Sequence, residues 1–251
     1  MAFRAKLPKT YTFDFTDAPF PSSPAPGINA VFNSGHYTFW PQPTVALIRG
    51  ANKWLTDYIE AHGPYDVVMG FSQGCSLISS FLLYHAQETP EEELPFKAAV
   101  FVCGGVPMPV LEDLGLPGVS PRAHEVNDRT GKLLKEKAGK LAELAENLDR
   151  IKPGMGLWDD VLSLLHDPTK IPDESDVFGL DFTVMPKEVR IKIPTVHVYG
   201  GLDPRWPSSM QLAYFCDDRK MYDHGGGHDI PRSTEVSVTI ARFFEELNQE
   251  I

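Results

Sequence analysis

The stretch 67-VVMGFSQGCSLIS-79 places a serine between two glycines, directly after a run of apolar, strand-forming residues. Its pentapeptide GFSQG satisfies the G-x-S-x-G pattern of a nucleophile elbow, in which a serine lies on a strained turn between a strand and a helix. We expect glycine at positions 70 and 74 because a Cβ at either would press against neighbouring backbone in so tight a turn. The apolar segments on both sides favour Ser72 as a nucleophile over an ordinary turn residue.

Outward from this stretch, strand-like and helix-like segments alternate along the chain. Apolar strands that alternate with helices indicate a mainly parallel sheet covered by helices on both faces, which is an α/β fold. Residues 20–43 are rich in Pro, Gly, Ser and Asn and are expected to form a long loop. The predicted strands are 11–16, 66–70, 97–105, 195–201 and 219–226, and the predicted helices are 44–63, 73–85, 208–216 and 233–249.

The alternation breaks down between the third and fourth of these buried strands. We expect a single domain, 1–251, in which residues 106–190 form a helical lid over the carboxyl ends of the strands. Helices are predicted at 132–150, from the stripe Leu134, Ala138, Leu141, Ala145 and Leu148, and at 158–166. Apolar lid residues that are candidates to line a cavity over Ser72 are Met108, Leu111, Trp158, Leu162, Phe178, Leu180 and Phe182.

Composition excludes several classes of partner. The formal net charge is −11 and the pI is near 5.1, so neither nucleic acid nor an anionic membrane surface is expected to bind. The N-terminus lacks the apolar core of a secretory signal, and no apolar run is long enough to span a membrane. Three widely spaced cysteines fit neither a disulfide framework nor a zinc pattern. These features predict a cytoplasmic protein with reduced, buried thiols.

A serine nucleophile needs a base to take its proton and an acid to orient that base. In this fold the order along the chain is Ser, then Asp or Glu, then His, each just beyond the end of a strand. The stretch 196-VHVYGGLDP-204 places Asp203 after one predicted strand, and 222-YDHGGGHDIPR-232 places His228 after the next. Each residue could have an ordinary loop role, but the shared order and position favour a Ser72–Asp203–His228 triad.

The run HGGGH admits two other interpretations. In lipases and esterases a His-Gly-Gly-Gly run can form the oxyanion hole, but that loop precedes the nucleophile in sequence, whereas this one follows it. The second interpretation is a metal site formed by His224 and His228 with Asp223 and Asp229. Zinc-binding histidines at this spacing usually lie on a helix, which three intervening glycines disfavour. We therefore expect no metal, and the glycines are better explained as letting the loop approach Ser72.

The chain resembles the FSH family of serine hydrolases, small α/β-hydrolases common in fungi. The resemblance rests on DAPFPSSPAPGI (17–28), GFSQGCSLIS (70–79), IPTVHVYGGLDP (193–204) and YDHGGGHDIPR, and is weakest across 108–175. It implies an α/β-hydrolase fold, the triad roles of Ser72, Asp203 and His228, and acyl transfer to water without a cofactor. Family members are esterases or thioesterases, and several release acyl chains in polyketide pathways of secondary metabolism. The implied partners are a small ester or thioester and an acyl carrier domain of a polyketide synthase.

One feature departs from the family pattern. Members begin with a strand and an LHG-type loop that gives a backbone N–H to the oxyanion hole, and this sequence starts beyond that point. The N–H of Gln73 is the expected first donor, and the second has no visible source. Without the missing strand, residues 11–16 would have to pair with 66–70, or a partner chain in a homo-oligomer would have to fill the gap. A shortened gene prediction and a fold adapted to another reaction would each account for the departure.

Three functions remain open at this stage. The first is hydrolysis of esters or thioesters of apolar acyl groups through an acyl-enzyme on Ser72. The second is a non-hydrolytic reaction, such as cyclisation or elimination by a lyase, in the same pocket. The third is a binding protein that keeps an unused triad. The apolar lid residues favour medium or longer apolar acyl groups over acetyl, since pockets for small molecules are mainly apolar.

Overall fold

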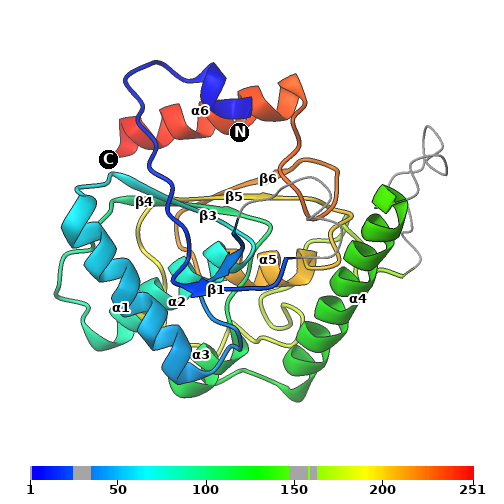
Figure 1. The fold of residues 1–251 in the computed structure, drawn as a ribbon. Helices are drawn as coiled ribbons and strands as arrows, with labels where there is room; N and C mark the ends of the chain where they lie inside the picture. Colours follow the sequence, from blue (N-terminus) through cyan, green and yellow to red (C-terminus); the bar gives the residue numbers. More distant parts are fainter. Residues whose placement is uncertain (1, 25–34, 147–157, 159–162) are drawn as a thin grey trace.

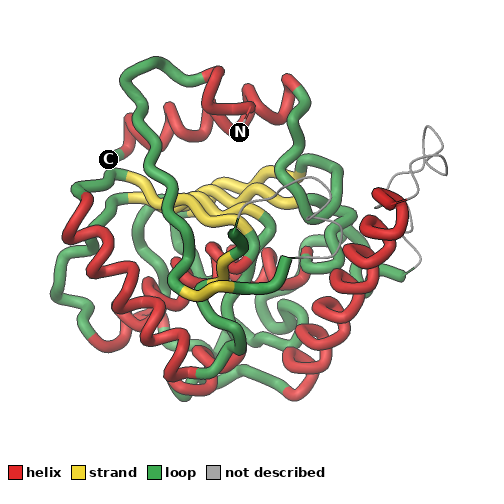
Figure 2. The backbone as a smooth tube through the Cα atoms, viewed as in Figure 1, coloured by secondary structure: helices red, strands yellow, loops and turns green. Residues whose placement is uncertain are grey.

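Four short strands form a parallel sheet in the computed structural model, which describes residues 2–24, 35–146, 158 and 163–251. The order across the sheet is β3 (Val67–Phe71), β4 (Ala98–Val102), β5 (Thr195–Tyr199) and β6 (Arg219–Asp223). Successive strands in the chain are therefore neighbours in space, each reached through a crossover (Figures 1 and 2). The four corresponding strand predictions are confirmed, with ends that differ by a few residues.

Helices cover both faces of this sheet and make two separate cores. On one face, Ala98, Val100 and Val102 of β4 pack with α6 (Thr234–Glu250) and the 3-10 helix η1 (Ala2–Lys6). On the other face, the alternate β4 residues pack with α1 (Val45–His62), α2 (Gln73–Glu88) and α5 (Trp206–Tyr214). Figure 1 shows α6 and the N-terminal turn on one side of the strands and the other helices opposite. A strand that is apolar at every position, as β4 is, fits this two-sided burial.

The segment 106–190 contributes α3 (Met108–Asp113), α4 (Pro121–Glu146) and the short 3-10 helix η4 (Lys187–Val189). The predicted start of the long helix at residue 132 was wrong by eleven residues. Pro121 occupies the first helical position, where its missing N–H costs nothing, and Gly131 lies inside the helix instead of ending it. Polar residues in the first turns of α4 hid its periodicity. Residues 147–150 of the predicted helix lie outside the described part of the chain.

The second predicted lid helix, 158–166, falls mostly outside the described residues, and its described end, 163–166, forms turns and bends. Residues 20–43, expected as a loop, contain a two-stranded antiparallel ladder of β1 (Phe20–Pro21) and β2 (Tyr37–Thr38). The three cysteines are free and buried. In the described part of the chain, no helix combines the length and the hydropathy that a bilayer crossing requires.

The predicted strand at 11–16 was wrong, because these residues form no ladder. Their alternating aromatic residues pack on the N-terminal turn and α6: the ring of Phe13 lies 5.9 Å from the rings of both Phe3 and Phe244. Asp14, between the aromatic residues, accepts hydrogen bonds from the hydroxyls of Tyr58 and Tyr65. The alternation therefore reflects packing on helices and not sheet pairing.

The predicted pairing of 11–16 with 66–70 is consequently absent. A cavity of about 510 Å³ is lined by residues 10–15 on one side and by residues of the β3 edge, including Val67, Met69 and Phe71, on the other. Among the described residues, β3 has a strand partner on one side only.

Candidate active site

Ser72 lies on the turn between β3 and α2 with a φ of 52° and a ψ of −113°. A positive φ is strained for a residue with a side chain and persists only where the surroundings enforce it. Here the Ser72 N–H donates to the carbonyl of Val102 on β4, and the Ser72 carbonyl accepts from the N–H of Cys75 in α2. The backbone is therefore held from both elements, as the elbow pattern in the sequence predicted.

The two glycines that flank Ser72 differ in the space available for a side chain. A Cβ on Gly70 would lie 2.6 Å from the Cys75 nitrogen and from the Gly74 carbonyl carbon, so the turn requires glycine there. A Cβ on Gly74 would meet only the ring of Phe39, at 4.0 Å. The expectation of crowding is confirmed at position 70 and wrong at position 74, where a Cβ would have ordinary van der Waals room.

The structure brings the three residues of the predicted triad together. His228 Nε2 lies 2.9 Å from Ser72 Oγ, and His228 Nδ1 lies 2.7 Å from Asp203 Oδ2. Because a carboxylate can only accept, the proton on the ring belongs on Nδ1, and Nε2 is then free to accept from the serine hydroxyl. Asp203 is fully buried, and its other oxygen accepts from the backbone N–H of Arg205 at 2.7 Å.

The loops that carry Asp203 and His228 are bonded to each other. The N–H of Leu202 donates to the Gly226 carbonyl, and Asp223 Oδ1 accepts from the backbone N–H groups of Gly201 and Gly225. A Cβ on Gly200 would lie 2.1 Å from the Gly226 oxygen, so this close approach needs glycine at position 200. Within HGGGH, Gly225 has a positive φ of 72°, and a Cβ on Gly227 would lie 1.9 Å from the Trp158 ring, so both positions favour glycine.

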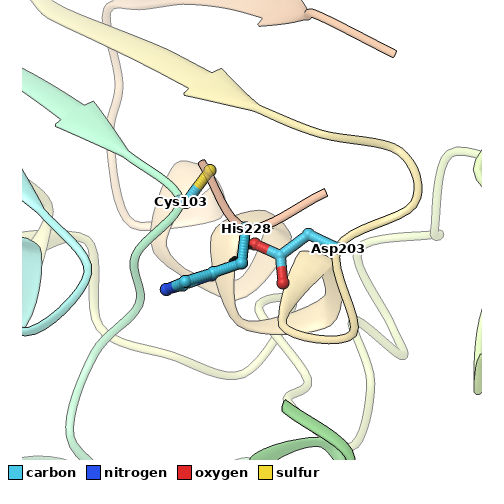
Figure 3. Close-up of side chains that lie close together, drawn as sticks. All are labelled: Cys103, Asp203 and His228. Carbon is cyan, nitrogen blue, oxygen red and sulfur yellow. Dashed lines mark hydrogen bonds and ion pairs between the residues drawn. The ribbon is translucent and has the colours of Figure 1, made fainter. Parts of the chain in front are cut away.

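A metal site would need several side-chain donor atoms that are close together and free to bind. In the described residues, the side chains with metal-binding geometry are Cys103, Asp203 and His228, shown in Figure 3 at the ends of neighbouring strands and in the loop beyond. Burial raises the pKa of the Cys103 thiol, which opposes the thiolate that a metal needs. Asp203 already accepts two hydrogen bonds. The Nδ1 atom of His224 accepts from the N–H of Gly226, so that side chain stabilises the loop.

Gln73 occupies the first position of α2, and in the described part of the chain its N–H donates to no backbone carbonyl. Such an N–H at a helix start favours negative charge, which suits the predicted oxyanion donor. Its side chain has a second role that the sequence did not reveal. Oε1 accepts from Thr38 Oγ1 and from the N–H of Phe39, and Nε2 donates to the carbonyl of Trp40. This amide holds residues 38–40 beside the elbow.

A cavity of about 250 Å³ opens over Ser72. Met108 lines it, as expected from the sequence. Leu134, Asn127 and Arg205 also line it, and none of these three was among the expected lining residues. The remaining residues proposed for the lining behave differently: Leu111, Leu180 and Phe182 are buried in the core, Phe178 packs edge-on against Trp206, Trp158 lies against Gly227, and Leu162 is outside the described residues.

Comparison with known proteins gives one family. A sequence model of the family described as serine hydrolase (FSH1) matches residues 1–240. Hydrolase FUB4 of Fusarium oxysporum f. sp. lycopersici is 27% identical over 262 residues, covering 96% of this chain and 89% of that protein. Esterase FUS5 of Gibberella fujikuroi is 30% identical over 247 residues, covering 94% of this chain and 73% of that protein.

Among solved structures, alpha/beta hydrolase domain-containing protein 10 from mouse matches with a TM-score of 0.43 and 13% identity. The match covers 87% of this chain and 74% of the mouse protein.

Proposed function

This chain belongs to the FSH1 family of serine hydrolases, and from that membership we propose that it cleaves carboxylic esters or thioesters through an acyl-enzyme on Ser72. The observation that carries the proposal is the continuous hydrogen-bonded chain from Ser72 Oγ through the His228 ring to Asp203, with distances of 2.9 and 2.7 Å. A serine activated in this way is the general requirement for covalent acyl transfer.

Each residue of the chain has a distinct role in the proposed reaction. His228 Nε2 takes the hydroxyl proton as Ser72 Oγ attacks the carbonyl carbon, and returns it to the departing alcohol or thiol. A water molecule then repeats the attack on the acyl-enzyme and regenerates the serine. Asp203 holds the ring in the tautomer that this sequence needs and stabilises the imidazolium that forms in each half-reaction.

The N–H of Gln73 is the proposed donor to the developing oxyanion. Its place at the start of α2 adds the favourable potential of the helix terminus. Removing one of two donors from an oxyanion hole typically lowers kcat by about 10²–10³. If Gln73 acts with a single N–H, turnover of simple esters should be slow even where acylation of Ser72 is readily detected.

The proposed substrates are esters and thioesters of medium-length, mainly apolar acyl groups, including polyketide-type chains presented by an acyl carrier domain. The Ser72 cavity has apolar lining residues beside its polar ones, namely Trp40, Pro43, Val106, Met108 and Leu134. Two of these residues come from α3 and α4, which supports a lid role for 106–190. The relative FUS5 is described as an esterase, which agrees with ester cleavage.

Covalent labelling tests the proposal. A fluorophosphonate probe should modify the wild-type protein, and peptide mass analysis should place the label on Ser72. The variant Ser72→Ala should remain folded and lose both labelling and ester turnover, whereas Ser22→Ala, at an exposed serine, should keep both. Labelling at another residue, or turnover by Ser72→Ala, would contradict the assignment. A wild-type protein that is not labelled would support a binding protein, and product analysis would separate hydrolysis from cyclisation or elimination.

Chain-length dependence tests the acyl preference. Each methylene buried from water contributes about 0.8 kcal/mol, so two extra carbons should raise kcat/KM roughly tenfold while they still fit. We expect p-nitrophenyl esters of two to twelve carbons to show a rise from acetyl to a maximum at medium length. A flat or falling profile would contradict an apolar acyl pocket.

A further inference from the structure

Arg205 is the one arginine or lysine among the described residues that line the Ser72 cavity. It follows Asp203 by two positions, and its backbone N–H donates to that carboxylate. Arg205 immediately precedes α5, and its side chain bonds to Asn127 and Thr130 of α4. The chain carries 34 acidic and 23 basic residues, so a basic group in this cavity is not explained by composition.

The partners of the Arg205 guanidinium are all uncharged. Nη1 donates to the Asn127 carbonyl at 2.8 Å and to Thr130 Oγ1 at 2.9 Å, and Nη2 donates to Asn127 Oδ1 at 3.0 Å. In the described residues no carboxylate lies within 4.0 Å of it. By contrast, Arg49 pairs with Glu88 and Asp113 through the same kind of group.

A guanidinium has five N–H groups, and these three hydrogen bonds use three of them. The remaining two are Nε–H and one Nη2–H, which have no hydrogen-bond partner in the described part of the chain. In a guanidinium, Nε–H and the neighbouring Nη2–H point in parallel along one edge of the planar group, an arrangement that a carboxylate can accept with both oxygens. Burial lowers the pKa of Arg205, as expected for a charge without a counter-ion in contact.

From this geometry we infer that Arg205 is a specificity-determining residue that binds a carboxylate on the acyl group, so that the preferred substrates are esters or thioesters of dicarboxylic acids. The inference rests on the proposed function of Ser72. The scissile carbonyl would lie at Ser72, the methylenes along Met108 and Leu134, and the far carboxylate at Arg205. A neutral acyl chain would exclude water from the two remaining N–H groups without giving them an acceptor, and this penalty provides the discrimination.

A matched pair of esters tests the inference. Mono-p-nitrophenyl adipate and p-nitrophenyl hexanoate have the same number of acyl carbons and the same leaving group, and differ in the terminal carboxylate. A hydrogen-bonded charge pair should favour the adipate ester by roughly tenfold or more in kcat/KM in the wild-type protein. In Arg205→Gln this ratio should fall to about one or below. Arg205→Lys, which keeps the charge without the planar pair of N–H groups, should give an intermediate ratio.

The control for net charge is Arg242→Gln, because Arg242 lies on the exposed side of α6 and its loss changes the charge equally. It should keep the wild-type ratio. If Arg205→Gln lowers turnover of both esters by the same factor, Arg205 only anchors α4 and the inference is wrong. A wild-type ratio of one or less would also overturn it.

A binding measurement tests the carboxylate site independently of whether the protein is a hydrolase. The mono-anilide of adipic acid should bind to Ser72→Ala in a calorimetric titration, and binding should weaken about tenfold or more in Ser72→Ala with Arg205→Gln. If the protein is labelled by fluorophosphonate and turns over the hexanoate ester but shows no preference for the carboxylate, only the proposed role of Arg205 is rejected. Carboxylate binding without labelling or turnover would reject the hydrolase proposal and leave the carboxylate site standing.

Discussion

Asp203 has both oxygens engaged, one by His228 and one by the Arg205 N–H, and is shielded from water. Asp203→Asn should keep this packing but present an N–H₂ or a neutral oxygen to the ring, which disfavours the productive tautomer. We expect kcat to fall by about 10⁴ while the thermal unfolding midpoint changes little. Steady-state kinetics and thermal denaturation would check both.

Near-normal kinetics in Asp203→Asn would require another acid. Asp217 and Asp218, the next acidic residues along the chain after Asp203, lie at the opposite end of the sheet. The carbonyl of Asp218 accepts from Thr195 at the start of β5, whereas Ser72 and Asp203 lie beyond the carboxyl ends of their strands. Normal activity would therefore contradict the triad itself.

The glycines of the elbow give a second prediction at the residue scale. Gly70→Ala places a Cβ 2.6 Å from backbone atoms of α2 and should cost several kcal/mol of unfolding free energy, in the range of overpacking. Gly74→Ala should be neutral or stabilising by about 1 kcal/mol, because alanine is favoured over glycine inside a helix and the site has room. Urea denaturation of the pair would show the contrast, and equal destabilisation would mean that the turn is less constrained than its geometry indicates.

At the scale of elements, β3 is held on one side by β4, and the cavity beside residues 10–15 leaves its other side without a strand. The Ser72 N–H points to β4, and N–H groups alternate in direction along a strand. The N–H groups of Val67, Met69 and Phe71 therefore point to the open edge. Their amide hydrogens should exchange with solvent much faster than those of Val68 and Gly70, as measured residue by residue by NMR.

Val100 of β4, which has strand partners on both sides, is the matched reference for Met69. Equal protection of Met69 and Val100 would show that another segment pairs with the β3 edge in solution. A homo-oligomer that fills the gap would be one source of such a segment. Comparing exchange at two protein concentrations would identify it.

On the scale of the whole molecule, one buried histidine, His197, and two partly buried ones, His166 and His224, are disfavoured in their charged form by burial. Burial lowers the pKa of His197 from 6.5 to about 3, and burial also lowers those of His166 and His224. A histidine that takes up a proton only when the chain unfolds makes unfolding easier as pH falls. Above pH 6.5 the histidines are neutral in both the folded and the unfolded chain, so they do not reduce stability. Below pH 6.5 the unfolded chain takes up protons on them, and the free energy of unfolding decreases.

We therefore expect the free energy of unfolding to fall below about pH 6.5, by up to about 1.4 kcal/mol per pH unit for each such histidine. His197→Phe removes one titrating group and should flatten this dependence. Phe101→Leu, which alters the ring that stacks on His197, should lower stability but keep the slope. Urea denaturation between pH 5 and 8 would measure both slopes, and identical slopes in wild type and His197→Phe would contradict the prediction.

The local patterns in the sequence were sufficient for the four strands of the sheet, for most helices and for the proximity of Ser72, Asp203 and His228. Each of these depends on near neighbours: an apolar run sets a buried strand, G-x-S-x-G sets the turn, and polar residues at strand ends meet at one edge of a parallel sheet. The order of the triad along the chain then followed from the order of the strands.

The tertiary structure decided what depends on distances between remote segments. The alternation of aromatic and polar residues in 11–16 fits both a strand and an extended segment packed on α6. Only the contact of Phe13 with Phe244 distinguishes the two. The room beside Gly74 depends on where Phe39 lies. Arg205 bonds to Asn127, 78 residues away in the sequence, and no local pattern indicates that its side chain lines the cavity over Ser72.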